Sequence, residues 1–448
     1  MNNKNGKLSW GEKLAYGMGD SGANVVCALT GTYLTAFYTD TVGIATAAVG
    51  TMMLLARIFD GVTDIIMGAI VDKTKTRWGK ARPWVLWSAP FMALSIILMF
   101  NFPSGMSDSG KLVYAYITYI FQNCIVYTAN NLPYNALLAR MTLDVQDRAT
   151  ASSLRFIMAQ LTMLIVNAIT ANALATVGWF WLSIIYGIVC MVMLFLCFLG
   201  CKEHIGEDKE GDLHVENIPL KTALPALFKN KYFYIQALLF CLFYLSLNAS
   251  GAMTFYFCNI ILDDITLLTY TSMATSLPMI VINFAMPPLV KKFGKQKMMI
   301  MGSLLYIIGS ILIGAGDSKF AIVLAGLIVK GFGLGPIASG IFAMTADVVD
   351  YGEWKTGIRS EGLVNSCTSF GMKVGCGVGA AIGAWLLTIG HYDGTAAVQP
   401  ESAVNMIRFG YGYLGAVIGV IVLILCFMMN IDKHIGQIQH DLEAKTNA

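Results

Sequence analysis

Charged residues are scarce in this sequence of 448 residues: Asp, Glu, Lys and Arg make up 13%, whereas 56% of the residues are hydrophobic. Soluble globular proteins carry about 25% charged residues, because their surfaces must be hydrated. This deficit excludes a soluble protein and predicts an integral protein that crosses the membrane many times. The formal net charge is only +3, so the sequence has no basic excess with which to bind nucleic acid.

Signatures of catalysis and of nucleotide-driven pumping are also missing. The sequence contains neither the GxxxxGK[ST] motif of ATP-binding loops nor the HExxH motif of zinc peptidases. Its five histidines lie outside the apolar segments, which excludes a proton relay through membrane-embedded imidazoles. We therefore expect no enzyme activity and no cofactor apart from a transported ion. The ten cysteines form no CxxC pair and are interpreted as small buried side chains.

Hydrophobic residues, by contrast, gather in long runs separated by charged or Gly- and Pro-rich breaks. A helix needs about 20 apolar residues to cross a bilayer, and twelve runs approach or exceed that length. Their approximate ranges are 14–39, 45–71, 83–102, 111–139, 149–175, 178–201, 232–262, 266–290, 298–316, 319–349, 359–389 and 405–431. We expect an all-α integral membrane protein with twelve transmembrane helices.

A polar segment at 201–231 divides these runs into two sets of six. RWGK at 77–80 and KFGK at 292–295 occupy matching places, after the second run of each set. We expect a six-helix bundle at 1–200, a central cytoplasmic loop at 201–231, a second bundle at 232–431 and a cytoplasmic tail at 432–448. Two halves around a central site are typical of secondary transporters. Lys and Arg concentrate in the loops beside the repeats, which predicts that both termini are cytoplasmic.

Three charged residues interrupt the second apolar run: Arg57, Asp60 and Asp64. Their spacing of three and four residues places them on one helix face, with Thr63 beside the last of them. Each ion near the bilayer centre costs about 2.5–3.5 kcal/mol, so the group needs compensation. A bound sodium ion or a proton would supply the missing positive charge. A structural Arg and Asp network that only stabilises helix packing is the alternative.

Uncharged polar residues recur every four positions in the fourth run: Tyr127, Asn131 and Asn135, with Thr128 on a neighbouring line. Amides donate and accept hydrogen bonds without carrying charge, which suits the hydroxyl groups of a sugar. Hydrogen bonding between packed helices is the alternative. Further polar candidates within the apolar runs are Asp20, Asn24, Arg155 and Lys373. Lys373 either balances a carboxylate or extends its amine toward the membrane surface.

Six longer motifs are spread over both halves of the sequence. They are LAYGMGD at 14–20, YTDTVG at 38–43, LARIFDGVTDIIMG at 55–68, RWGKARPW at 77–84, NLPYNAL at 131–137 and ADVVDYGEWKTGIRSEG at 346–362. In this order they resemble the glycoside–pentoside–hexuronide cation symporters of the major facilitator superfamily, the family of the melibiose carrier. The resemblance implies the major facilitator fold, a place in the bacterial inner membrane and cation-coupled sugar uptake.

The resemblance also implies roles for individual residues. Cation-binding oxygens match Asp60, Asp64, Thr63 and Thr128. Sugar contacts match Asn24, Tyr127, Asn131, Asn135 and Arg155, and Asp20 shares a helix face with Asn24. Lys373 matches a lysine near the cation site and, with Arg57, is expected to balance charge there. Residues of a cytoplasmic gate match Asp347, Asp350, Glu353 and Arg359.

One departure from the melibiose carriers concerns the sugar. Those carriers have aspartates at the places of Asn24 and Asn131, and a tryptophan at the place of Asn135. We therefore expect a hexuronide, a xyloside or another pentoside rather than a galactoside, with Na⁺ or H⁺ as the coupling ion. The expected partners are the sugar, the cation and the lipid bilayer, and we expect a monomer. Two alternatives stay open: a transporter of a lipid or other amphiphile, and a membrane sensor that does not transport.

Overall fold

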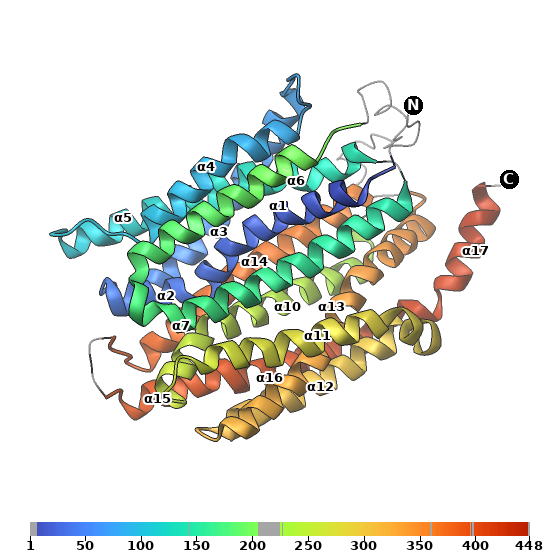
Figure 1. Cartoon of the computed structure of the whole chain (residues 1–448). Coiled ribbons are helices and arrows are strands. Elements are labelled where there is room, and N and C mark those ends of the chain that lie inside the picture. Colours follow the sequence, from blue (N-terminus) through green and yellow to red (C-terminus); the bar gives the residue numbers. More distant parts are fainter. Residues whose placement is uncertain are drawn as a thin grey trace. The chain divides into compact units, whose positions relative to one another are not determined.

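The structure, a computed structural model, describes residues 7–142, 144–204, 225, 227–358, 361–394, 396 and 398–446, and the regular elements in these ranges are helices (Figure 1). The chain divides into two compact units. Unit 1 comprises Met1–Val215 and Asp393–Ala397, and unit 2 comprises Glu216–Tyr392 and Val398–Ala448. Most of the expected central loop, from 205 to 224, lies outside the described residues.

Unit 1 is a bundle of long helices in which α1 packs along α7, and α4 packs against both α6 and α7. Its elements are α1 (Trp10–Ala28), η1 (Leu29–Tyr33), α2 (Leu34–Ala36), η2 (Phe37–Thr41), α3 (Thr46–Lys73), α4 (Arg82–Met99), α5 (Asp108–Ile120), η3 (Phe121–Val126), α6 (Tyr127–Met141) and α7 (Val145–Gly200).

Local sequence explains where several of these helices begin and end. Ser9 and Glu12 form a reciprocal capping box at the start of α1, and Asp144 caps α7 by accepting from the Asp147 backbone N–H at 2.9 Å. Within α7, Gly178 has φ 73° and ψ 164°, a conformation that other residues rarely adopt, and it divides the element into two rods. The expected break between the fifth and sixth runs therefore lies at this glycine.

Short π-helical segments interrupt the long helices of unit 1. η1 and η2 follow α1, and η3 directly precedes the polar strip of α6. A π-helical turn contains an extra residue, so it rotates the side chains that follow relative to those that precede it. The side chains of α6 therefore face in directions that α-helical spacing alone would not predict.

Unit 2 is a second helical bundle, in which α10 packs along α14 and α13 packs against α11 and α12. Its elements are α10 (Lys231–Tyr256), η4 (Phe257–Ile261), α11 (Leu267–Phe293), α12 (Lys295–Gly316), α13 (Phe320–Thr356), α14 (Glu361–Ile389), α15 (Glu401–Arg408), η5 (Phe409–Tyr413), α16 (Leu414–Met428), η6 (Asn430–Lys433) and α17 (Ile435–Thr446).

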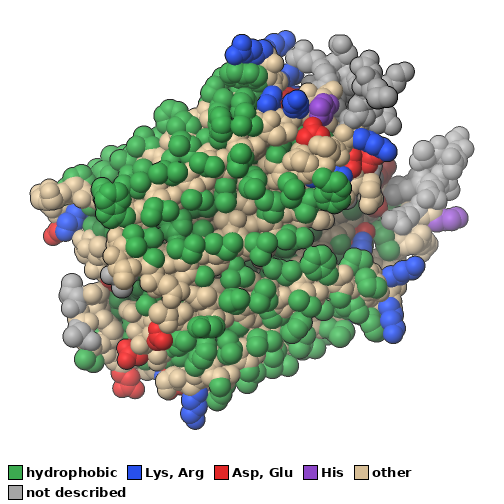
Figure 2. All heavy atoms as spheres, in the orientation of Figure 1, with side chains coloured by type: hydrophobic (Ala, Val, Ile, Leu, Met, Phe, Trp, Pro, Cys, Tyr) green, Lys and Arg blue, Asp and Glu red, His purple; other side chains and the backbone are tan. Residues whose placement is uncertain are grey.

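Within the described residues, nine helical stretches are long and apolar enough to cross a membrane. Large apolar side chains also cover much of the surface seen in Figure 2. Among the exposed ones, Phe284, Phe370 and Ile117 are 69%, 67% and 62% exposed. Such surfaces are stable only against lipid or a partner. Three further helical stretches, at 10–41, 46–73 and 108–141, are not among the nine. They carry most of the charged and amide side chains expected to bind the cation and the sugar.

Candidate functional site

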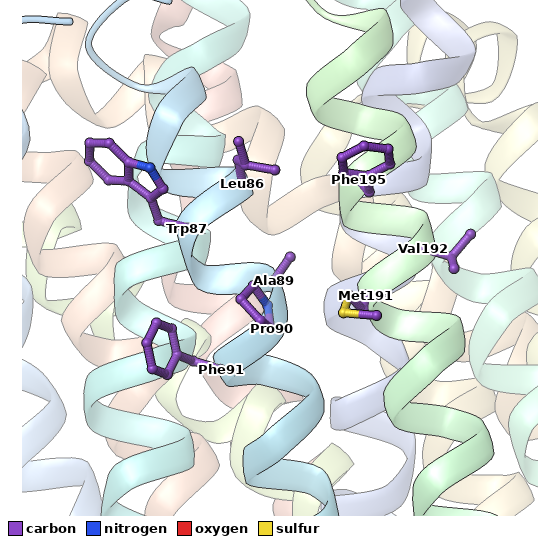
Figure 3. A pocket seen from close by; sticks show the side chains of 8 residues that line it. All are labelled: Leu86, Trp87, Ala89, Pro90, Phe91, Met191, Val192 and Phe195. Carbon is purple, nitrogen blue, oxygen red and sulfur yellow. The ribbon is translucent and has the colours of Figure 1, made fainter.

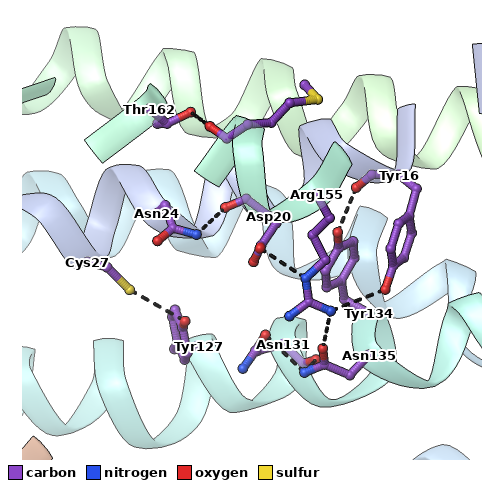
Figure 4. A network of polar contacts seen from close by, with 11 residues as sticks. Tyr16, Asp20, Asn24, Cys27, Tyr127, Asn131, Tyr134, Asn135, Arg155 and Thr162 are labelled. Atoms are coloured by element: carbon purple, nitrogen blue, oxygen red, sulfur yellow. Dashed lines mark hydrogen bonds and ion pairs between the residues drawn. The ribbon is translucent and has the colours of Figure 1, made fainter. Parts of the chain in front are cut away.

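An arginine of α7 forms the centre of a polar cluster in unit 1. Arg155 Nε donates to Asp20 Oδ2 of α1 at 2.9 Å, and its terminal N–H groups donate to Asn135 Oδ1 of α6 at 2.6 Å and to the Tyr16 hydroxyl at 3.3 Å (Figure 4). A planar guanidinium has five N–H donors in a fixed fork, so this one side chain can bond to two other helices at once. Arg155 thereby holds α1, α6 and α7 together at the predicted sugar site.

Two tyrosines that the sequence analysis did not single out complete this cluster. The rings of Tyr16 and Tyr134 stack at 4.7 Å, and the Arg155 guanidinium lies 5.2 Å from the Tyr134 ring. The Tyr134 hydroxyl donates to the backbone carbonyl of Tyr16 at 2.6 Å, and both side chains are fully buried. Their positions gave a signal: Tyr16 lies one turn before Asp20, and Tyr134 precedes Asn135 within NLPYNAL. The stacked pair forms a rigid aromatic support beneath the guanidinium.

The other predicted sugar-binding residues lie along the same two helices. Asn135 Nδ2 donates to the Asn131 backbone carbonyl at 2.8 Å and lies 3.2 Å from its Oδ1. Asn24 Nδ2 donates to the backbone carbonyl of Asp20 at 2.8 Å. Further along, the Tyr127 hydroxyl contacts Cys27 Sγ at 3.5 Å, bridging α6 to α1 (Figure 4). These contacts leave lone pairs and amide hydrogens that a polyol could use.

The cluster around Arg155 is close to electrically neutral. Asp20 and Arg155 form an ion pair, with side-chain exposures of 13% and 30%. A paired carboxylate and guanidinium orient their remaining donor and acceptor sites without adding net charge. The arrangement can therefore bind a neutral hydroxylated ligand. An anionic ligand would have to compete with Asp20 for the guanidinium.

A second group of predicted residues meets between α3 and α6. The Thr128 hydroxyl donates to Asp60 Oδ1 at 3.0 Å, and the Arg57 guanidinium lies 3.6 Å from Asp60 Oδ2. Asp60 is only 4% exposed. The hydroxyl of Thr63 donates to the backbone carbonyls of its own helix, at 3.1 Å to that of Asp60. Asp64 lies one turn further along α3 and is partly exposed.

These contacts bring Asp60, Thr128 and Arg57 together, as their expected roles require. Carboxylate and hydroxyl oxygens are the ligands that hard cations prefer. At 3.6 Å, the contact of Arg57 with Asp60 is longer than a direct hydrogen bond. The assignment of a cation site to Asp60, Asp64, Thr63 and Thr128 stays a prediction.

The expected gate residues lie on α13 in unit 2. Asp347 is 3% exposed and forms an ion pair with Lys295 of α12, whose Nζ lies 2.6 Å from its carboxylate. Asp350 and Glu353 are partly exposed and follow at spacings of three residues on α13. Arg359 lies outside the described residues. The ion pair therefore ties the ends of α12 and α13 together, and the gating role stays a prediction.

Unit 2 also contains two lysines within its apolar helices. Lys373 of α14, expected to balance charge, is partly exposed. Lys330 of α13 was not singled out, although it interrupts the apolar run at 319–349. Its Nζ donates to Ser250 Oγ at 3.1 Å and lies 5.3 and 5.9 Å from the rings of Tyr306 and Tyr411. It is 4% exposed, and in the described part of the chain no carboxylate pairs with it.

The arrangement of helices is similar to that of a protein of known structure. The match with a crystal structure of a mutant of the nucleoside transporter NupG covers 93% of this chain and 100% of the NupG chain. Its TM-score is 0.65 and the sequence identity is 14%. At that identity the match concerns the fold alone. The chain belongs to the MFS/sugar transport protein family, whose model matches residues 15–433.

Curated relatives support the same family. The chain is 34% identical to the isoprimeverose transporter of Lactiplantibacillus pentosus, over 98% of this chain and 92% of that protein. It is 31% identical to a glucuronide carrier protein homolog of Escherichia coli, over 89% of this chain and 87% of that protein. It is 30% identical to the putative glycoside/cation symporter YagG of the same organism, over 90% of this chain and 88% of that protein.

These matches confirm the resemblance to the glycoside–pentoside–hexuronide branch of the major facilitator superfamily. They also confirm that the chain is a multi-pass protein of the bacterial inner membrane. Three points stay predictions: the roles of individual residues, the number of transmembrane helices and the orientation of the termini.

Proposed function

We propose that this protein is a symporter that couples the downhill entry of Na⁺ or H⁺ to the uptake of a glycoside by alternating access. We infer that the three less apolar helical stretches, at 10–41, 46–73 and 108–141, also cross the membrane, which gives twelve helices and places both termini in the cytoplasm. Their polar side chains are tolerated in the membrane because they face the interior of a bundle. The working unit is a monomer.

A single helix that serves both candidate sites is the observation that carries this proposal. On α6, Thr128 contacts Asp60 of the candidate cation site. The same helix presents Asn135 to Arg155 in the candidate sugar site. At about 1.5 Å per residue, their separation of seven positions spans roughly 10 Å. A movement of α6 that follows cation binding therefore reaches the sugar site directly.

The coupling follows from the charge on Asp60. Without a cation, a buried carboxylate holds Thr128 and attracts Arg57. A bound cation neutralises the carboxylate and changes the balance of these contacts, so α6 settles in a different position. Coupling between two binding sites is a free energy that acts in both directions. The sugar must therefore strengthen cation binding as much as the cation strengthens sugar binding.

We propose that the substrate is a neutral glycoside with a pentose unit. The ion pair between Asp20 and Arg155 leaves no unbalanced positive charge for a carboxylate. The relatedness to an isoprimeverose transporter supports the same class. A hexuronide is the second candidate, because another relative is a glucuronide carrier homolog and Arg155 could exchange Asp20 for a sugar carboxylate.

Transport by an Asp60→Asn variant in proteoliposomes tests the proposal. The variant keeps an oxygen beside Thr128 but loses the charge that attracts a cation. We expect accumulation of labelled isoprimeverose driven by an ion gradient to disappear, while exchange of the sugar across the membrane continues. Asp64→Asn should give the same pattern.

Asp317→Asn is the matched control, because Asp317 is an exposed carboxylate that pairs with Arg408 far along the chain from either site. This variant should accumulate sugar like the unmodified protein. Full accumulation by Asp60→Asn and Asp64→Asn would refute the cation site. Absence of both accumulation and exchange from the unmodified protein, for pentosides and glucuronides alike, would refute the sugar-symport proposal.

A further inference from the structure

An apolar groove runs along the surface of unit 1 between α4 and the second rod of α7. Its volume is about 700 Å³, and its walls include Trp87, Pro90 and Phe91 of α4 and Met191, Val192 and Phe195 of α7 (Figure 3). Trp87, Phe91, Val192 and Phe195 are between 41% and 52% exposed. This volume lies within the range of about 300–1,000 Å³ typical of sites for small molecules.

Contacts between the two helices close the groove at each end. A Cβ atom added to Gly187 would lie 3.1 Å from the backbone oxygen of Ala93, so the helices almost touch there. At the other end, Arg82 Nε donates to the Phe198 carbonyl at 2.8 Å, and its guanidinium lies 4.4 Å from the Phe198 ring. The groove is therefore held open between two fixed contacts.

Basic residues are concentrated in the segment that leads into α4, at one end of the groove. The loop from α3 to α4 and its flanks contain Lys73, Lys75, Arg77, Lys80 and Arg82 within ten residues. Lys73 and Arg77 are exposed. The carboxylate of Glu203 accepts from the backbone N–H groups of Lys80, Ala81 and Arg82 at 2.8–3.1 Å. Glu203 thus caps α4 and is held at its N-terminus, beside the basic side chains.

The distance from the basic loop to the far end of the groove is similar to the length of a lipid acyl chain. From Arg82 to Phe91, α4 rises by about 14 Å, and one leaflet of the hydrocarbon core is about 15 Å thick. Trp84 Nε1 donates to Thr74 Oγ1 of the loop at 3.0 Å, and the ring of Trp84 packs edge-on against that of Trp87. Tryptophans concentrate at the boundary between headgroups and hydrocarbon. The loop therefore lies at headgroup level and the groove directly beneath it.

From this placement we propose that unit 1 binds an anionic phospholipid, with one acyl chain in the groove between α4 and α7 and the phosphate against the basic loop. Clusters of Lys and Arg beside membrane helices attract anionic headgroups by about fivefold in affinity for each residue. A zwitterionic lipid would fill the groove but would gain little from the loop. The site binds lipid whether or not the protein transports a sugar.

Native mass spectrometry of the purified protein tests the proposal, with phosphatidylglycerol and phosphatidylcholine of identical acyl chains as probes. The unmodified protein should retain phosphatidylglycerol at least about 25-fold more strongly, which is the product of about fivefold for each of two exposed basic residues. Lys73→Gln combined with Arg77→Gln should remove most of this preference, because the phosphate loses two partners. Val192→Trp should reduce retention of both lipids, because its indole fills the groove.

Two controls carry matched changes elsewhere. Lys291→Gln with Lys297→Gln removes the same charge from the adjoining ends of α11 and α12 in unit 2. Val417→Trp makes the same Val-to-Trp change on α16 in unit 2, where the side chain is 53% exposed. Both should bind phosphatidylglycerol like the unmodified protein. Equal retention of the two lipids by the unmodified protein, or an equal loss in variants and controls, would overturn the proposal. No sugar is present, so the result is independent of the proposed transport.

Discussion

Single residues in this protein act by holding several partners at once. Arg155 joins Asp20, Asn135 and Tyr16, which belong to two other helices. Asp60 joins Thr128 to Arg57. Asp60 is only 4% exposed, so water cannot easily replace a lost partner there, and removal of one partner leaves the carboxylate unsatisfied.

Replacement of Arg155 by lysine should weaken sugar binding although it keeps the charge. One ammonium group cannot reproduce the planar fork that bonds to Asp20 and Asn135 together. We expect the affinity for isoprimeverose to fall at least about tenfold, equivalent to roughly 1.4 kcal/mol, as measured by isothermal titration calorimetry. Arg148→Lys is the control, because Arg148 bonds to the carbonyls of Thr142 and Ala139 outside the cluster. An equal loss in both variants would contradict a specific role for Arg155.

Two lysines of unit 2, the buried Lys330 and the partly exposed Lys295, should respond to mutation in opposite ways. Lys330→Met removes one hydrogen bond to Ser250, worth about 1 kcal/mol, but also removes a charge whose burial costs several kcal/mol. The melting temperature should therefore stay the same or rise. Lys295→Met leaves the buried carboxylate of Asp347 without its partner and should destabilise the protein by about 3 kcal/mol. Differential scanning fluorimetry measures both. A large loss of stability in Lys330→Met would indicate that the ammonium has a partner of its own.

At the scale of the element, breaks in the helices decide where side chains point. Gly178 separates α7 into two rods, of which the first carries Arg155 and the second lines the lipid groove. The π-helical η3 precedes the polar strip of α6 and sets its rotation. Spacing in the sequence correctly predicted which residues share a helix. It gave no sign of the π-helical turns, because these depend on packing against neighbouring helices rather than on a residue pattern.

Gly178→Ala should destabilise the break in α7. Nothing lies within 4 Å of the added Cβ, so the cost comes from the backbone conformation alone, about 1–3 kcal/mol. Gly68→Ala makes the same change within α3, where the Cβ also meets open space. This control should be neutral or stabilising by up to about 1 kcal/mol, because alanine favours a helix. Thermal unfolding in detergent measures both, and equal melting temperatures would contradict the expected strain at Gly178.

For the molecule as a whole, the proposed coupling sets a limit on accumulation. One positive charge that crosses about 100 mV releases roughly 2.3 kcal/mol, which corresponds to on the order of 50-fold accumulation of a neutral sugar. Proteoliposomes with a potassium diffusion potential should approach this ratio, and vesicles without a potential or an ion gradient should only equilibrate. Runs with and without Na⁺ identify the coupling ion. Equal accumulation with and without the membrane potential and the ion gradients would contradict symport.

The sequence by itself determined that this is a helical membrane protein of the sugar-transport branch, and which chemical groups lie within its apolar segments. Composition, run length and local spacing carry that information, because each depends on residues that are neighbours in the chain. Only the tertiary structure decided which of those groups meet. Arg155 and Asp20 are 135 residues apart, and Thr128 and Asp60 are 68 apart. Such pairs form through the packing and rotation of whole helices, as do the stack of Tyr16 on Tyr134 and the groove beside α4, and local spacing does not specify these.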